Sequence, residues 1–350
     1  MSTGTSYALT MATRRLNQNR VITLNCGLGR DSITMMCLLA EGLLQATIDG
    51  TLQPIAPEDI DAIVFSNTGC EWDHTYQVLP RARALALLMG VRFVVLEKAA
   101  EVVEDRDEPA TGWDRIEAKA TAGAYHLRPA IMDDLQSRAT VVSLGKGDCT
   151  DNHKIQPIRK FIADVARLLH GVDSNASWSS KVRAGLRLPH LTLIGIAADE
   201  TSRLANGGHG PDYVTEAYPL VEMGIAKPDE AAILRRWGLN DVRKSGCFMC
   251  PYQPIAWYWA LSVTQPDAWA RAVHYEDVAL ARNAKMNVTG VRIDGVLARL
   301  PQLVERWRAA NPEATVDAVL DKQYSRCNKD ARAQRKVDTA TVGHAALVTA

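Results

Sequence analysis

The first hundred residues alternate between two hydrophobic periodicities, and this alternation constrains the fold more than any other feature. Short apolar, β-branched runs at 21–26, 62–65 and 91–96 are typical of buried strands. Helical patterns begin at Ser32 and span 75–89 between these strands. A strand–helix–strand–helix–strand order predicts a parallel sheet with right-handed crossovers. We therefore expect the α/β class, with a twisted parallel sheet and helices on both faces.

The middle of the chain is less regular, and its C-terminal third is helical. An amphipathic pattern over 155–170 predicts a helix, and the apolar run 191–196 is the clearest later strand. Residues 140–144 are a further candidate strand. Beyond Pro228, helical patterns recur over 228–237, 254–263, 266–285, 296–309 and 312–320. We predict an α/β domain over 1–205, a mainly helical part over 206–328 and a flexible basic tail over 329–350.

The charge balance limits the expected partners. The chain has 350 residues, 47% of them hydrophobic, so it can bury a sizeable core. Its 40 Lys and Arg residues balance its 40 Asp and Glu residues, so no overall field favours nucleic acid. Any contact with tRNA or DNA therefore requires a local basic patch, and six basic residues between Lys322 and Lys336 are a candidate.

The N-terminal residues 1–19 are polar and lack the apolar core of a signal peptide. No stretch of about 18 apolar residues predicts a membrane span. We therefore expect a cytoplasmic protein without a membrane partner, and its oligomeric state stays open. In that compartment the seven cysteines are expected to bind metal or carry out thiol chemistry rather than form disulfides.

The segment Gly27-Leu-Gly-Arg-Asp-Ser32 lies between the first predicted strand and the first predicted helix. Small residues permit a sharp turn close to a ligand, and a helix N-terminus offers N–H groups to an anion. Arg30 adds a positive charge and Ser32 a hydroxyl donor. The segment lacks the ending of a Walker loop and the last glycine of a dinucleotide fingerprint. It therefore indicates either a phosphate site of another kind or a simple tight turn.

Five motifs follow one another in the order found in one superfamily. Residues 27–32 resemble the PP-loop, S-G-G-x-D-S, of the adenine nucleotide α-hydrolase superfamily. Residues 67–71, 148–157 and 194–203 resemble the D-T-G-x-E, C-T…K-x-x-P and I-G-I-R-x-D-E-S-x-R segments of phosphoadenosine phosphosulfate reductases. Residues 244–251 resemble the S-G-C-x-x-C-P segment of reductase-like proteins that hold an iron–sulfur cluster. The resemblance extends from the first predicted strand to the C-x-x-C motif.

Some positions depart from these motifs. Gly27 stands at the first serine of the PP-loop, Leu28 replaces a glycine, and Ala197 stands where an arginine is usual. The chain also lacks an E-C-G-L-H segment, which carries the attacking cysteine in the reductases. That absence argues against a conventional sulfonucleotide reductase.

The resemblance implies an adenine-nucleotide site. ATP would place its phosphates over residues 27–32 and its adenine near Thr68 and Glu71. Asp199 and Glu200, at the end of a predicted strand, are candidates to hold Mg²⁺ on a polyphosphate, or else are the usual acids of a helix N-terminus. The candidate catalytic residues are Arg30, Asp31, Cys70 and Arg203. The candidate nucleotide-binding residues are Gly27, Leu28, Gly29, Arg30, Asp31, Ser32, Thr68, Glu71, Asp199 and Glu200.

The cysteines suggest a metal centre. Cys247-x-x-Cys250 places two thiols on one turn, a spacing suited to zinc or an iron–sulfur cluster. The resemblance places Cys149 beside them, and Cys327 is our choice for the fourth ligand. The resemblance favours a [4Fe–4S] cluster, with structural zinc and free thiols as alternatives. Cys70 would act as a nucleophile only if its pKa were lowered.

The leading functional hypothesis is an ATP pyrophosphatase in sulfur transfer. The resemblance implies that it adenylates an oxygen on a nucleobase or nucleic-acid backbone, with tRNA or DNA as acceptor. A cysteine desulfurase or another donor would supply the sulfur. One alternative is a sulfonucleotide reductase that uses adenylyl sulfate or its 3′-phosphate form. Another is a non-catalytic nucleotide- or nucleic-acid-binding protein with structural zinc.

Overall fold

The computed structural model describes residues 19–98, 111–140, 148–172, 175–206, 213–283, 288–289, 291–293 and 296–322. The chain divides into two compact units. The sheet unit comprises Met1–Asn67, His74–Leu127 and His153–Ser245. The helical unit comprises Thr68–Asp73, Arg128–Asn152 and Gly246–Ala350. Residues 206–245, expected with the helical part, therefore belong to the sheet unit.

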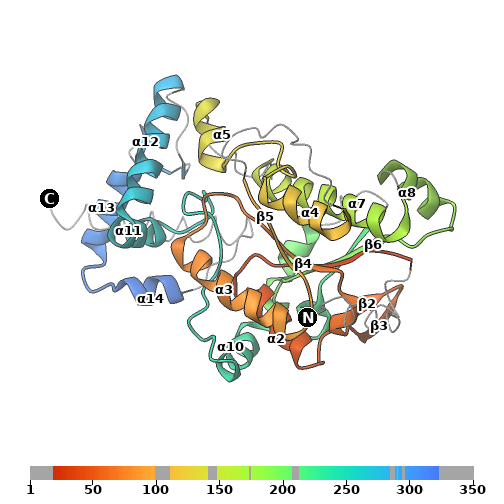
Figure 1. Cartoon of the computed structure of the whole chain (residues 1–350). Helices are drawn as coiled ribbons and strands as arrows, with labels where there is room; N and C mark the ends of the chain where they lie inside the picture. The colour runs from red at the N-terminus through yellow and green to blue at the C-terminus, as the bar shows by residue number, and fades with distance from the viewer. Residues whose placement is uncertain are drawn as a thin grey trace, which may run out of the picture. The chain divides into compact units, whose positions relative to one another are not determined.

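A five-stranded parallel sheet forms the centre of the sheet unit (Figure 1). Its strands, in sheet order, are β5 (Phe93–Leu96), β4 (Ala62–Ser66), β1 (Ile22–Asn25), β6 (His190–Ile194) and β7 (Val214–Ala217). Leu24 of β1 lies opposite Ile63 of β4 and Leu193 of β6. The predicted α/β class with a parallel sheet is confirmed.

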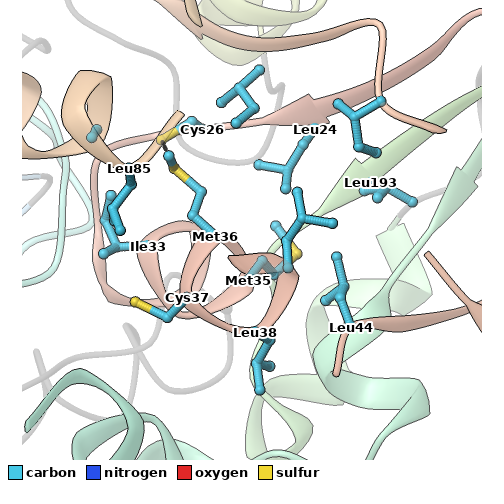
Figure 2. Close-up of a cluster of buried hydrophobic side chains, with 14 of the residues drawn as sticks. Leu24, Cys26, Ile33, Met35, Met36, Cys37, Leu38, Leu44, Leu85 and Leu193 are labelled. Atoms are coloured by element: carbon cyan, nitrogen blue, oxygen red, sulfur yellow. Dashed lines mark hydrogen bonds between the residues drawn. The ribbon is translucent and has the colours of Figure 1, made fainter. Parts of the chain in front are cut away.

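Helices cover both faces of this sheet, because strand residues point alternately to either side. On one face, Leu24 and Ile63 pack with apolar residues of α2 (Arg30–Ala40) and α3 (Asp73–Leu88) (Figure 2). Two further helices, α9 (Pro219–Glu222) and α10 (Lys227–Arg236), complete this layer. On the other face, Val21 and Val64 pack with α4 (Gly112–Thr121), α7 (Gln156–His170) and α8 (Asn175–Arg183).

The order of the strands reverses beside β1. Along the chain, β1, β4 and β5 are added toward one edge of the sheet, and β6 and β7 are added on the other side of β1. Ligands of open α/β sheets bind outside the carboxyl ends of the strands at such a reversal. In this chain those ends lead into the loop at 27–29 and into the short 3₁₀ segment η3 (Ala198–Asn206).

A small hairpin interrupts the connection between α2 and β4. Its strands are β2 (Gln45–Ile48) and β3 (Thr51–Pro54), followed by the 3₁₀ turn η1 (Pro57–Asp59). Asp49 and Gly50 have φ angles of 52° and 82°, which suit a two-residue hairpin turn. This hairpin was not predicted, although Asp49-Gly50 is a turn signal in the sequence.

The helical unit contains α5 (Ile131–Ser137), α6 (Asp148–Thr150), α11 (Ile255–Thr264), α12 (Pro266–Arg282), α13 (Leu300–Ala310) and α14 (Val316–Asp321). It also has the hairpin β8 (Arg292–Ile293) and β9 (Val296–Leu297). Trp72 and Trp257 are buried edge to face, with ring centroids 5.3 Å apart. The fully buried carboxylate of Glu276 accepts hydrogen bonds from the backbone N–H groups of Val288 and Leu300.

The predicted helices in the C-terminal third are confirmed within a few residues, except that α13 and α14 start about four residues later than expected. The candidate strand at 140–144 and the basic tail at 329–350 lie outside the described residues, apart from Thr140. A π-helical turn, η2 (Asp151–Ile155), precedes α7. No helix among the described residues is long and apolar enough to cross a membrane.

Candidate functional site

The loop after β1 makes a sharp turn into α2. Gly29 has an extended backbone and accepts the first hydrogen bonds of the helix, from Ile33 N–H and from the Ser32 hydroxyl, both at 3.0 Å. Leu28 has a φ of 59°, in the left-handed region, and its side chain is fully buried. This conformation costs a non-glycine residue about 1–2 kcal/mol, whereas burying a leucine contributes about 1.5–3 kcal/mol. Leu28 therefore anchors the loop where the PP-loop motif has glycine.

The glycines of this loop are required by packing within the sheet unit. A Cβ atom at Gly29 would lie 2.7 Å from Ser245 Oγ and 2.8 Å from Ser245 N. A Cβ atom at Gly195, after β6, would lie 3.0 Å from both Asp31 Cβ and Ser32 N. We had attributed the small residues to close approach of a ligand. The structure gives a second reason for the small residues, because the loop packs closely between Ser245 and Gly195.

A network of charges connects the ends of β1 and β6. The buried carboxylate of Glu200 lies 2.6 Å from Arg203 Nη1, 3.0 Å from Lys227 Nζ and 3.7 Å from Lys244 Nζ. Arg203 Nη1 also lies 3.5 Å from Asp31 Oδ2. Glu200 thus holds three cations at the N-terminus of α2, an arrangement suited to binding oxyanions.

The pKa values of the two carboxylates in this network shift in opposite directions. Burial alone would raise the pKa of Glu200, but Lys244 and Arg203 outweigh it and hold the pKa at about 2. Burial raises the pKa of Asp31, and Lys244 and Arg203 only partly oppose this effect. At neutral pH Glu200 is therefore ionised. Its three cationic partners pair it with basic side chains, and the expectation that Asp199 and Glu200 hold Mg²⁺ stays a prediction.

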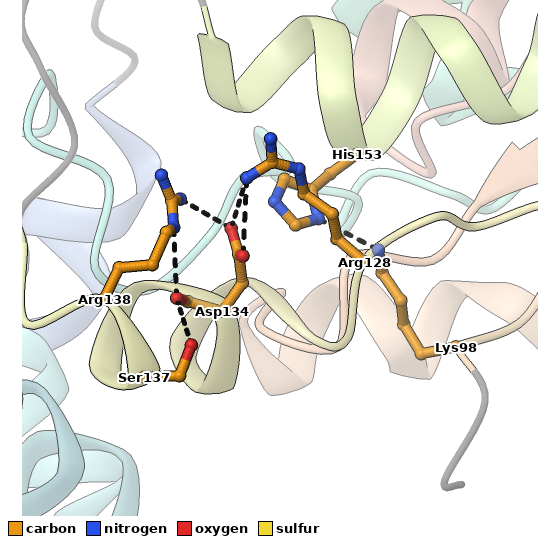
Figure 3. Close-up of polar contacts among 6 residues, drawn as sticks. All are labelled: Lys98, Arg128, Asp134, Ser137, Arg138 and His153. Carbon is orange, nitrogen blue, oxygen red and sulfur yellow. Dashed lines mark hydrogen bonds and ion pairs between the residues drawn. The ribbon is translucent and has the colours of Figure 1, made fainter. Parts of the chain in front are cut away.

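A second polar group lies after β4 and β5 in the sheet unit. The ammonium of Lys98 lies 2.8 Å from His126 Nδ1. It also lies 2.9 Å from His153 Nδ1 (Figure 3). His126 Nε2 lies 2.9 Å from the carbonyl oxygen of Leu96, so this nitrogen carries the proton and Nδ1 accepts from Lys98. Burial and the charge of Lys98 lower the pKa of His126 to about 4. The imidazole is therefore neutral at physiological pH.

In the helical unit, the segments at 68–72 and 246–250 lie side by side. Phe248 N–H donates to the carbonyl of Cys70 at 2.9 Å, and Glu71 pairs with Cys247 as an isolated antiparallel bridge. The Thr68 hydroxyl donates to Glu71 Oε1 at 3.0 Å and lies 3.5 Å from Cys247 Sγ. Two motifs almost 180 residues apart in the sequence are therefore brought together.

Three of the four proposed metal ligands pack against one hydrophobic cluster of the helical unit. Cys247 is buried, and Cys149 and Cys250 are partly buried against the same cluster. The backbone N–H of Cys250 donates to the Cys247 carbonyl at 3.0 Å, which forms the expected tight turn. Among the described residues, no three His, Cys, Asp or Glu side chains are placed to hold one metal ion. Cys327 lies outside the described residues.

Two further cysteines are deeply buried. Burial raises the pKa of Cys70 to about 12 and that of Cys26 to about 11. Both are therefore protonated at neutral pH, and the lowered pKa that a nucleophilic role requires is not found for either thiol. Cys26 packs in the core beside Met36 (Figure 2).

The predicted site residues thus fall into two groups. The sheet unit carries Gly27, Leu28, Gly29, Arg30, Asp31, Ser32, Asp199, Glu200 and Arg203. The helical unit carries Thr68, Cys70, Glu71, Cys149, Cys247 and Cys250. Our sequence reasoning overlooked Lys98, Lys227, Glu230 and Lys244. Of these, Lys98 had a local signal because it follows the predicted strand 91–96 by two positions, and Lys244 had one because it opens the motif at 244–251.

No protein-family model, curated protein or solved structure matches the chain. The parallel sheet and flanking helices form a Rossmann-like α/β fold that is compatible with a PP-loop domain.

Proposed function

We propose that this chain is a PP-loop ATP pyrophosphatase that adenylates a nucleobase or nucleic-acid backbone for iron–sulfur-dependent sulfur transfer. The proposal is supported mainly by the position of the phosphate loop. The loop at 27–32 lies at the carboxyl end of β1, beside β6, where the strand order reverses and α2 begins. This is the position in an open α/β sheet where a helix N-terminus binds phosphate.

The charge network supports a role in displacing pyrophosphate. In the proposed reaction an acceptor oxygen attacks the α-phosphorus of ATP, and the bond to the β-phosphate oxygen breaks. Negative charge then grows on the leaving pyrophosphate, which Arg30 and Arg203 would stabilise. Glu200 keeps Arg203, Lys227 and Lys244 in place before ATP binds. We propose that Mg²⁺ enters with ATP, bound to its phosphate oxygens.

We further propose that Cys149, Cys247, Cys250 and Cys327 hold a [4Fe–4S] cluster, with zinc as the alternative metal. The tight C-x-x-C turn supports Cys247 and Cys250 as a ligand pair, whereas Cys149 and Cys327 are proposed from the resemblance. When bound, the cluster would supply the sulfur-transfer chemistry.

The test is an analysis of products. Protein purified without oxygen would be incubated with ATP labelled at the α-phosphate, Mg²⁺, sulfide as the sulfur donor that displaces AMP from the adenylated acceptor, and either total tRNA or sheared DNA. We expect AMP and pyrophosphate in equal amounts, with turnover lost in Arg203→Ala and kept in Arg167→Ala, a surface variant away from the loop. Release of ADP, or of sulfite from a sulfonucleotide without ATP turnover, would contradict the proposal.

A further inference from the structure

One stretch of the sheet unit is rich in cations. Residues 154–190 contain seven Lys and Arg residues but two Asp residues and no Glu, whereas the whole chain has 40 basic and 40 acidic residues. Most of this stretch forms α7, α8 and the turn before β6. It is therefore positively charged in a chain without net charge, and a local patch of this kind attracts anionic partners.

The cations of α7 lie away from its buried face. Its buried residues, among them Ile158, Phe161 and Val165, recur at helical spacing and pack with the strands of the sheet. Lys160 lies opposite this face, and Arg159 lies at its border. Both side chains are partly exposed, so both can contact a partner bound along the helix.

The acidic residue of α7 is compensated by neighbouring cations. Asp164 Oδ2 lies 3.1 Å from Lys119 Nζ of α4, and Asp164 Oδ1 lies 2.9 Å from Arg167 Nη1. Two cations thus offset one carboxylate, so Asp164 does not cancel the charge of Arg159 and Lys160. Lys119 and Arg167 are already engaged in this way, and we do not count them with the surface defined below.

The segment after α7 extends the positive charge. Residues 175–190 hold three cations and no acidic residue. The imidazole of His170, at the end of α7, has its centroid 5.3 Å from that of the Trp178 ring in α8. The guanidinium of Arg187 lies 6.0 Å from the centroid of the same ring, so the end of α7 and the turn after α8 lie together. We define the α7–α8 surface as Arg159, Lys160, Lys181, Arg183 and Arg187.

This surface begins at the edge of the sheet that carries the phosphate loop. Ser66, the last residue of β4, donates its hydroxyl to the carbonyl oxygen of His153 at 2.8 Å. This bond holds the turn before α7 at the carboxyl end of β4. Because β4 pairs with β1, that end lies beside the strand that leads into residues 27–32. A partner bound along α7 would therefore extend to the edge where we propose that adenylation takes place.

A chain of phosphates is the anion that suits such a surface. α7 has 15 residues and is therefore about 22 Å long, the length of about six phosphates along one strand of DNA. Phe161 and Trp178, the aromatic residues of α7 and α8, are fully buried and cannot stack on the bases of a single strand. Exposed cations over buried rings favour a double helix held by its backbone. Long double helices are the usual form of DNA, whereas RNA folds into short stems.

We propose that the α7–α8 surface binds the phosphate backbone of duplex DNA and orients it toward the phosphate loop. This proposal rests on the proposed function, which supplies the reaction, and it selects DNA from the two classes of acceptor. Contacts to phosphates position a duplex without reading its bases, so binding does not depend on DNA sequence.

The test is fluorescence anisotropy of a labelled DNA duplex of about 20 base pairs, titrated with the full chain at several salt concentrations. We expect Lys160→Gln/Lys181→Gln to bind at least about tenfold more weakly than wild type at about 0.1 M salt. The slope of log affinity against log salt should also fall by about 0.9 for each lost phosphate contact, hence by about 1.8.

A matched variant controls for the change in net charge. Arg83 and Arg235 are exposed on α3 and α10, which cover the other face of the sheet. Arg83→Gln/Arg235→Gln should therefore bind DNA as wild type does. Circular dichroism and melting curves of both variants establish that the fold is retained.

Three results would overturn the proposal. Wild-type protein could fail to bind the duplex, or total tRNA could displace the duplex at a lower phosphate concentration than unlabelled duplex does. Equal affinities of wild type and Lys160→Gln/Lys181→Gln would place the DNA elsewhere, for example on the basic residues between Lys322 and Lys336. Because binding is measured without ATP, a loss specific to Lys160→Gln/Lys181→Gln would support the surface even if the proposed adenylation failed.

Discussion

Replacement of Gly29 by alanine tests whether Ser245 fixes the phosphate loop. The new Cβ atom would lie 2.7 Å from Ser245 Oγ, 2.8 Å from Ser245 N and 3.1 Å from Ser245 Cβ. The hydroxyl can rotate away, but the backbone nitrogen cannot move without shifting the chain around residue 245. Ordinary contacts of a Cβ atom begin at 3.4 Å, so the loop or Ser245 must move by about 0.6 Å.

Overpacking of this kind costs about 1–3 kcal/mol. We therefore expect Gly29→Ala to lower the free energy of unfolding by this amount in urea titrations followed by circular dichroism. Displacement of the loop should also weaken ATP binding. A loss of about 1.4 kcal/mol in the free energy of binding would lower the affinity about tenfold. Calorimetry would measure the affinity.

Two further variants serve as controls for the size of the Gly29→Ala effect. A Cβ atom at Gly27 would lie 3.3 Å from Ser245 Oγ, so Gly27→Ala should cost less than about 1 kcal/mol. Adding Ser245→Gly to Gly29→Ala removes the contacts with Oγ and Cβ but leaves the contact with the backbone, so it should restore only part of the loss. Wild-type stability and ATP affinity in Gly29→Ala would refute the packing argument.

Three further predictions concern pH, the charge network and the metal. His190 is fully buried and accepts a hydrogen bond from Val21 N–H, and burial lowers its pKa to about 3 from the ordinary value of about 6.5. The free energy of unfolding is therefore highest above pH 6.5 and falls by about 1.4 kcal/mol for each pH unit below it. Urea titrations at pH 7 and 5 would show this, and His190→Gln should flatten the slope; an equal slope would contradict the assignment. Glu200→Gln leaves three cations without their anion, so we expect the free energy of unfolding in urea titrations to fall by about 2 kcal/mol. The exposed control Glu117→Gln should lower it by less than about 0.5 kcal/mol. Similar losses in the two variants would rule out the network. Cys250→Ser should abolish the iron and acid-labile sulfide of protein purified without oxygen, expected at about four irons per chain in wild type; full metal retention would exclude Cys250 as a ligand.

Four strands could be predicted from the sequence because strands of parallel sheets are buried on both faces and form continuous apolar runs. β1, β4, β5 and β6 all have this character. β7 was missed because it has four residues, of which Thr215 is exposed and only Ala217 is buried. Such a segment has neither a long apolar run nor a clear alternation.

The site was predictable only where its residues lie in one local segment. The loop at 27–32 was found because its glycines, charge and hydroxyl all fall between a strand and a helix. The contacts of Lys227 and Lys244 with Glu200 could not be predicted, because tertiary folding alone brings these residues together. The contact between Gly29 and Ser245 joins positions more than 200 residues apart, so the packing reason for the glycine was also hidden.

The most direct test of the central claim is a calorimetric titration of ATP with Mg²⁺ into wild-type protein and into the double variant Asp31→Ala/Ser32→Ala. Asp31 and Ser32 form the start of α2, and the variant should retain the circular dichroism spectrum of the wild type. If the loop holds the phosphates, wild-type protein binds ATP and the double variant binds it at least about a hundredfold more weakly, a loss of about 2.8 kcal/mol. Equal affinities would place the nucleotide elsewhere, and no binding by wild type would contradict the account.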